Sequence, residues 1–278
     1  MKKTILILAF SGFWISVLSQ MSAKIDTISD DLYYSEIMDS TFVIIHKFPG
    51  KCNSMFILSG NNTGVLIDTP NETTGTKSLL DWINLNFGNL ELIAINTGFH
   101  NDNLGGNEYL RSKGIKIYGS SLTTRLITER ANDLKGIVME MTANIENKKY
   151  YDDFKNVAFL PPTDTFDIEK GLKLTVGKEM FDIYFPGESH TADNLVVYIS
   201  NKKILFGGCM IFSIPQKKPG YIADANMIEW PESVTHVQNR YKDIKIVVPG
   251  HGDWGNIDLL QHTIDILNKW NTEKYTGS

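Results

Sequence analysis

The chain has 278 residues, a formal net charge of −5 and 42% hydrophobic residues. This composition is sufficient for a packed core, and the basic residues are scattered along the chain, which argues against nucleic acid as a partner. The two cysteines, Cys52 and Cys209, exclude a disulfide scaffold, because they can form one bridge at most.

The first residues are typical of a secretory signal peptide. Lys2 and Lys3 give a positive start, and residues 5–17 form an apolar run that is short for a membrane span. We therefore expect residues 1–22 to be a signal peptide, with an uncleaved anchor as the alternative. Residues 23–278 would then form one domain in the periplasm or outside the cell, with no membrane span.

The rest of the chain alternates β-branched or aromatic runs with amphipathic segments. In the first half, strands are expected at 42–48, 54–59, 64–68, 92–96 and 115–118, and helices at 74–87, 103–113, 121–131 and within 136–154. In the second half, strands are expected at 172–176, 180–185, 195–200, 203–206 and 244–248, and helices at 231–241 and 256–270. Strand blocks followed by helices in both halves predict an α/β fold, an αββα sandwich with two facing sheets and helices outside.

Loops that follow predicted strands carry the residue types that bind zinc, namely His100, Asp102, His190, Cys209 and His251. Glycines beside the last two permit tight turns. A single histidine or cysteine is more often structural, but the order and spacing of all five predict a metal site.

The chain resembles the class B metallo-β-lactamases, nearest to their broad-spectrum first subclass. The matching segments are 66–70, 97–106, 187–198, 206–210, 223–225, 230–231 and 248–252. The resemblance covers the whole expected mature chain. It implies a zinc-dependent, monomeric hydrolase that opens the β-lactam ring of antibiotics.

The resemblance also implies two zinc positions, one of which has lost a ligand. The first would use His100, His190 and a histidine at position 98, where this chain has Gly98. The second is complete and would use Asp102, Cys209 and His251. Since two imidazoles bind a metal more weakly than three, we expect one zinc at the second position and a weak or absent zinc at the first.

The general base of the reaction would be His100 or Asp102, and the sequence does not choose between them. Two substrate-binding positions depart from the family pattern. Phe212 stands where the resemblance implies a lysine for the substrate carboxylate, and Tyr221 stands where it implies an asparagine.

Two further residues are candidates for contact with substrate. Lys218, with Lys217 beside it, would replace the missing cation, although solvated loop lysines are the simpler interpretation. Asn194 follows His190 closely and would orient that ligand or contact the substrate.

Three functions remain open at this stage. The leading one is β-lactam hydrolysis. The changes at Phe212 and Tyr221 also fit a hydrolase of another cyclic amide or ester, and Gly98 fits a degenerate metal-binding relative with little catalysis.

Some features lie outside this site pattern. His46, His236 and His262 have no ligand-type setting, and we expect structural or surface roles for them. The stretch 133–162 is longer than the resemblance predicts. We expect it to pack as helices, with a wall beside the site as the alternative.

Overall fold

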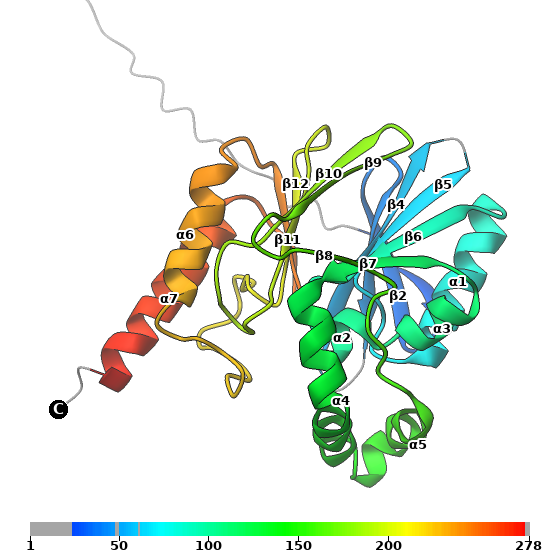
Figure 1. The fold of residues 1–278 in the computed structure, drawn as a ribbon, viewed down its shortest axis with the longest axis horizontal. Coiled ribbons are helices and arrows are strands. Elements are labelled where there is room, and N and C mark those ends of the chain that lie inside the picture. Colours follow the sequence, from blue (N-terminus) through cyan, green and yellow to red (C-terminus); the bar gives the residue numbers. More distant parts are fainter. Residues whose placement is uncertain (1–23, 48–49, 61, 276–278) are drawn as a thin grey trace, which may run out of the picture.

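The computed structural model describes residues 24–47, 50–60 and 62–275, so the expected signal peptide lies outside the described residues. Two sheets face each other, with α6 and α7 outside one and α1 and α3 outside the other (Figure 1). The predicted αββα sandwich is therefore confirmed. Among the helices of the described ranges, none has the length and apolarity to cross a membrane.

The first sheet contains eight strands in chain order, antiparallel from β1 to β5 and parallel from β5 to β8. They are β1 (Asp26–Ser29), β2 (Leu32–Met38), β3 (Thr41–His46), β4 (Cys52–Gly60), β5 (Thr63–Ile67), β6 (Glu91–Ile95), β7 (Lys116–Ser120) and β8 (Asp164–Phe166).

The second sheet has the order β13-β12-β11-β10-β9, and only its β12–β13 pair is parallel among the described strands. Its strands are β9 (Leu172–Val176), β10 (Glu179–Tyr184), β11 (Val196–Ile199), β12 (Ile204–Gly208) and β13 (Ile246–Pro249).

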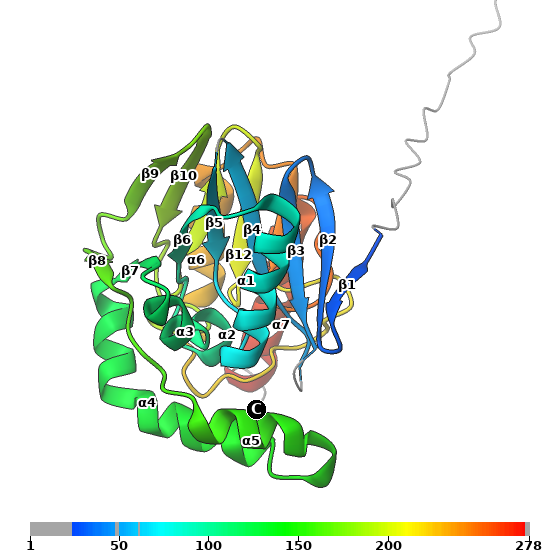
Figure 2. The same ribbon diagram turned by 90° about the vertical axis from the view of Figure 1, so that its right-hand side faces the viewer.

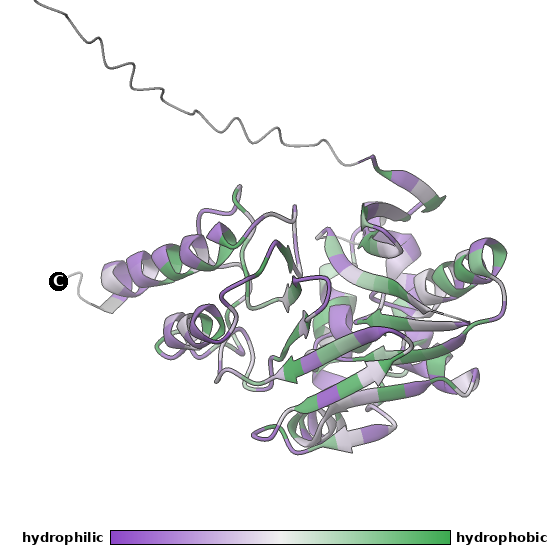
Figure 3. Cartoon of the chain, turned by 90° about the horizontal axis from the view of Figure 1, so that it is seen from above, coloured by the Kyte–Doolittle hydropathy of each residue, from purple (hydrophilic) through white to green (hydrophobic). Residues whose placement is uncertain are grey.

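The helices cover the outer faces and one end of the sandwich (Figure 2). They are α1 (Thr73–Phe87), α2 (Asn101–Leu104), α3 (Asn107–Ser112), α4 (Ser121–Met141), the 3₁₀ turn η1 (Ile145–Asn147), α5 (Lys148–Asn156), α6 (Trp230–Arg240) and α7 (Asp258–Tyr275). Hydrophilic and hydrophobic residues interchange along α7 (Figure 3), as expected for a helix with one buried face.

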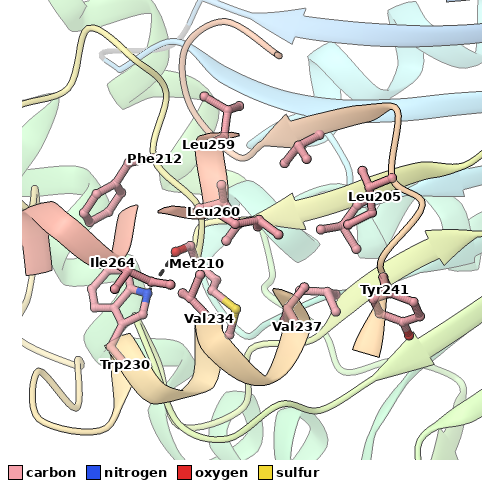
Figure 4. Close-up of a cluster of buried hydrophobic side chains, with 14 of the residues drawn as sticks. Leu205, Met210, Phe212, Trp230, Val234, Val237, Tyr241, Leu259, Leu260 and Ile264 are labelled. Carbon is pink, nitrogen blue, oxygen red and sulfur yellow. Dashed lines mark hydrogen bonds between the residues drawn. The ribbon is translucent and has the colours of Figure 1, made fainter. Parts of the chain in front are cut away.

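Separate apolar clusters hold the layers together. Between the sheets, Ile57, Phe181 and Phe206 are among the buried side chains. Between the second sheet and the helices α6 and α7, Trp230 at the start of α6 is buried and donates its indole N–H to the Met210 carbonyl at 2.9 Å (Figure 4). Because these clusters cover both faces of the second sheet around β11, β12 and β13, these three strands are almost continuously apolar, whereas β9 and β10 carry polar residues at alternate positions.

The structure departs from the expected elements in three places. The predicted helix at 103–113 is two short helices, because Gly105 passes so close to Asn71 that a Cβ would lie 1.9 Å from its carbonyl oxygen. The helix predicted at 121–131 continues to Met141 as α4. Strands β1, β2 and β8 were not expected, because they carry polar residues; β1 and β8 form the two opposite edges of the sheet, and β2 lies next to β1.

The three histidines outside the ligand pattern have structural positions. His236 Nδ1 lies 2.8 Å from the Pro186 carbonyl, and His262 Nε2 lies 3.2 Å from the Ser213 carbonyl. His46 is buried at the end of β3, where its Nδ1 accepts from the Asn71 backbone N–H at 3.1 Å. Burial lowers the pKa of His46 to about 4.

The pKa of His46 predicts a pH-dependent contribution to stability. The folded-state pKa lies below the ordinary histidine value of about 6.5, so protons bind preferentially to the unfolded chain as the pH falls from 6.5 towards 4. Through this group, the free energy of unfolding of the parent should fall by about 2–3 kcal/mol when the pH is lowered from 7.5 to 4.5. We expect the variant His46→Gln to lack it.

The measurement is urea unfolding of the parent and His46→Gln in chelator at both pH values. When the pH is lowered from 7.5 to 4.5, the free energy of unfolding of the parent should fall by about 2–3 kcal/mol more than that of the variant. An unchanged difference between the two proteins would contradict the assignment of a neutral buried imidazole.

Candidate metal centre

A cavity of about 560 Å³ opens where loops from both sheets meet beside α2 and α4. All five predicted ligand residues line it. The sequence prediction that these strand-end residues come together is therefore matched by their placement in the fold.

Asp102, Cys209 and His251 form the tightest group. The Cys209 thiol donates to Asp102 Oδ2 at 3.2 Å, and His251 Nε2 lies 3.1 Å from the same oxygen. Cys209 Sγ and His251 Nε2 are 3.8 Å apart. A carboxylate, a thiol and an imidazole that converge in this way fit a zinc ion with a further position open.

The orientation of His251 suits a metal ligand. Its Nδ1 lies 3.1 Å from the Lys51 carbonyl oxygen, which can only accept a hydrogen bond. This contact places the Nδ1 proton and leaves Nε2 directed at Asp102 and Cys209.

The thiol of Cys209 is protonated when no metal is bound. Burial, together with the nearby Asp102 carboxylate, raises the pKa of Cys209 well above its ordinary value. A metal ion must displace this proton to form the thiolate, so its affinity should increase with pH.

Two glycines allow the loops of Cys209 and His251 to approach each other. The Gly250 N–H donates to the Gly208 carbonyl at 2.6 Å, and a Cβ at Gly250 would lie 2.7 Å from the Gly208 carbonyl carbon. Asn53 of β4 fixes the same turn, since its side chain donates to the Pro249 carbonyl at 2.9 Å. Sequence reasoning missed Asn53, because its role depends on a contact between distant segments.

His100 is held by a second set of contacts. Its Nε2 donates to Asp224 Oδ2 at 2.9 Å, and Arg130 of α4 contacts the other oxygen of Asp224 at 2.7 Å. The guanidinium also lies over the Phe99 ring at 4.9 Å. Because Nε2 carries the donated proton, the acceptor nitrogen of a neutral His100 is Nδ1. No motif in the sequence points to Arg130, because its role depends on contacts between distant segments.

His190 lies beside His100, with 5.1 Å between the ring centroids. Burial, followed by the influence of His100, lowers the pKa of His190 to about 3, so this imidazole is neutral and able to bind a metal. Gly98 offers no side chain, and the described residues place no third metal-ligating group with these two.

Comparison with known proteins agrees with this arrangement. Residues 48–251 match the metallo-beta-lactamase superfamily. The chain belongs to this superfamily. Within it, the chain is a class B member close to the first subclass.

Curated relatives and solved structures resemble nearly the whole chain. "Metallo-beta-lactamase type 2" of Elizabethkingia meningoseptica is 30% identical, covering 89% of this chain and 86% of the relative. The protein of the same name from Bacteroides fragilis is 28% identical, covering 96% and 97%. A metallo-beta-lactamase structure from Pontibacter korlensis has a TM-score of 0.72 at 30% identity, covering 85% and 99%. TMB-1 has a TM-score of 0.72 at 29% identity, covering 87% and 100%.

The candidate substrate-binding residues of this superfamily member differ in placement. Tyr221 and Lys218 are exposed and line the cavity. Phe212 also lines it but is 3% exposed and packs on Trp230 with 5.2 Å between ring centroids (Figure 4). Asn194 is not among the lining residues, because it is buried and accepts from the Thr191 backbone N–H at 2.7 Å. Its position orients the His190 loop and offers no surface to a ligand in the cavity.

Helix α4 forms one wall of the cavity. Arg130, Leu134, Ile137 and Met141 line it from one helical face, at spacings of four, three and four residues. The longer stretch at 133–162 thus contributes a wall as well as packing, and the wall comes from the extended end of α4.

The second cysteine lies behind the metal centre. Cys52 is buried at the start of β4 and receives a hydrogen bond from the Asn71 amide at 2.9 Å. Both cysteines are free, so the two thiols are not joined.

The close approach at Gly250 yields a testable prediction. In the variant Gly250→Ala, the added Cβ would push against Gly208 and Cys209, and the ligands would move apart. We expect zinc affinity to fall at least about 10-fold, as when metal-ligand support is lost, measured by chelator competition. The control is Gly136→Ala, because a Cβ there meets nothing within 4 Å. Equal zinc affinity for both variants would contradict the prediction.

Proposed function

We propose that this chain is a secreted, monomeric zinc hydrolase that opens the β-lactam ring in the periplasm or outside the cell. It would work with one zinc at Asp102, Cys209 and His251. The observation that carries the proposal is the convergence of these three ligand atoms within 4.8 Å of one another in the cavity. The relatives named as metallo-beta-lactamases support it.

Zinc, when bound, would polarise the lactam carbonyl and stabilise the nitrogen anion that forms when the amide bond opens. The protein supplies the general base. His100 is better placed for this than Asp102, whose Oδ2 faces the Cys209 and His251 ligands. His100 accepts a proton from water at Nδ1, and Asp224 stabilises the resulting imidazolium through Nε2. Arg130 holds Asp224 in place.

A cation for the substrate carboxylate comes from the loop opposite α4. Lys218 is exposed, and its ammonium has no hydrogen bond or ion pair to the described part of the chain. Tyr221 lies near His100, with 5.8 Å between their ring centroids. Burial and Asp224 raise the pKa of Tyr221, so its hydroxyl stays a hydrogen-bond donor.

A second candidate is hydrolysis of another cyclic amide or ester. The buried Phe212 favours it, because no lysine stands at that position to hold a carboxylate. Turnover of lactones without turnover of β-lactams would select this candidate.

The test is hydrolysis of a chromogenic cephalosporin and a carbapenem across a zinc titration. We expect activity in the parent that chelator removes and one equivalent of zinc restores. The variant Cys209→Ser should lose at least about 100-fold in kcat/KM, because a hydroxyl is a much weaker zinc ligand than a thiolate. If the zinc-loaded parent hydrolyses neither substrate, the β-lactamase proposal is wrong. The remaining candidates would then be a hydrolase of another cyclic amide or ester and a degenerate metal-binding site.

The α4 wall predicts a preference among β-lactams. Leu134, Ile137 and Met141 present apolar surface to the cavity, so an aromatic acyl group should bind better than none. We expect Ile137→Ser to lower kcat/KM for benzylpenicillin about 3- to 10-fold and to leave 6-aminopenicillanic acid, which lacks the acyl group, nearly unchanged. In the control Met139→Ser, where the side chain packs in a core cluster, only stability should fall. An equal loss of kcat/KM for both penicillins would show that the α4 wall does not select for the acyl group.

A further inference from the structure

Position 98 is crowded although its residue is glycine. An ideal Cβ at Gly98 would lie 2.9 Å from Asn194 Nδ2 and 3.0 Å from Asn103 Oδ1. The backbone at Gly98 is not in the left-handed region, so space and not backbone conformation restricts this position. Any side chain there must displace one or both amides.

The Asn103 amide is fixed in this place by the loop that carries the ligands. Its Nδ2 donates to Asp68 Oδ2 at 2.9 Å and lies 3.3 Å from Thr97 Oγ1. The side chain is buried, and rotation away from position 98 would break both contacts.

The carbonyl oxygen of the same amide lacks a hydrogen-bond partner among the described residues. This atom, Asn103 Oδ1, is buried and faces Gly98. An unsatisfied buried carbonyl is unfavourable, so Asn103 fills this space at a cost. The same contact closes the space that a side chain at position 98 would need.

Asn194 is held just as firmly on the other side. Its Oδ1 accepts from the Thr191 backbone N–H at 2.7 Å and from Ser189 Oγ at 3.2 Å, on the loop of His190. Of the two amides, only Asn103 can be shortened without releasing the His190 loop, and its removal leaves the 2.9 Å approach to Asn194 Nδ2 as the one remaining close contact, within the described part of the chain, for a Cβ at position 98.

We propose that packing, and not only the loss of a ligand, limits this protein to one metal ion: Asn103 occupies the space of an imidazole at position 98. Restoring histidine there is insufficient, and the second metal position returns only when Asn103 is also shortened. This inference rests on the proposed zinc-binding function.

The first experiment counts zinc by mass spectrometry in the parent, Gly98→His, Asn103→Ala and the double variant, after equilibration with a small excess of zinc. We expect one equivalent in the first three proteins and two in the double variant. The cobalt-thiolate absorption band of Cys209 checks that the Asp102-Cys209-His251 position is intact in each. Two equivalents in Gly98→His alone, or one in a double variant with a normal band, would overturn the proposal.

The second experiment needs neither metal nor substrate. In chelator, Gly98→Ala should lower the Tm of the parent by roughly 2–4 °C or more, the shift expected for a modest packing conflict in a domain of this size. In the Asn103→Ala background, the same substitution should lower it by less than half as much.

Gly136→Ala, which meets no neighbour within 4 Å, is the control and should not lower the Tm. Equal Tm losses in the two backgrounds would show that Asn103 does not restrict position 98. Because this cycle is independent of zinc, it decides the packing argument even if the parent binds no zinc or hydrolyses no β-lactam.

Discussion

The site depends on the buried carboxyl of Asp68, which ties the end of β5 to the ligand loop. It accepts hydrogen bonds from the Thr97 backbone N–H at 2.7 Å, from Thr97 Oγ1 and from the Asn103 amide. Burial raises its pKa to about 8 even though these bonds favour the charged form. The Thr97 carbonyl in turn accepts from the Leu195 N–H at 2.8 Å, which connects this loop to the other sheet. The spacing between His100 and His190 follows from that connection.

The two halves of the centre have separate supports. The Cys209 and His251 loops meet through Gly208 and Gly250, whereas His100 is oriented by Asp224 and α4. The contact that joins the Cys209 and His251 loops does not involve position 98. The loss of a ligand at position 98 leaves the convergent group intact, which is why a one-metal centre is compatible with an otherwise complete loop framework.

Much of this arrangement could be predicted from the sequence, because strand-end loops with histidine, cysteine and aspartate have a recognisable pattern. The roles of Arg130 and Asn103 could not, since both depend on contacts between segments that pattern alone does not place together. The length of α4 was missed for a local reason: Gly136 and nearby charged residues weaken the helical signal where the helix in fact packs against the core. The split at Gly105 likewise follows from a tertiary contact with Asn71.

Tertiary packing also explains why position 212 carries no cation in this chain. Phe212 is part of the cluster around Trp230 (Figure 4), and its backbone N–H donates to Thr263 Oγ1 at 2.9 Å. A lysine at this position would place its charge against an apolar core, which is costly without a partner. Lys218 of the neighbouring loop lies at the exposed rim of the cavity, where its ammonium stays hydrated, and it is the cation that we propose for the substrate carboxylate. An anchor at the rim holds its ligand more weakly than a buried one, because water screens the attraction. Selectivity in this cavity should therefore come mainly from its apolar walls. The metal centre should hold one end of the ligand in place, and contacts with the walls should then distinguish one ligand from another.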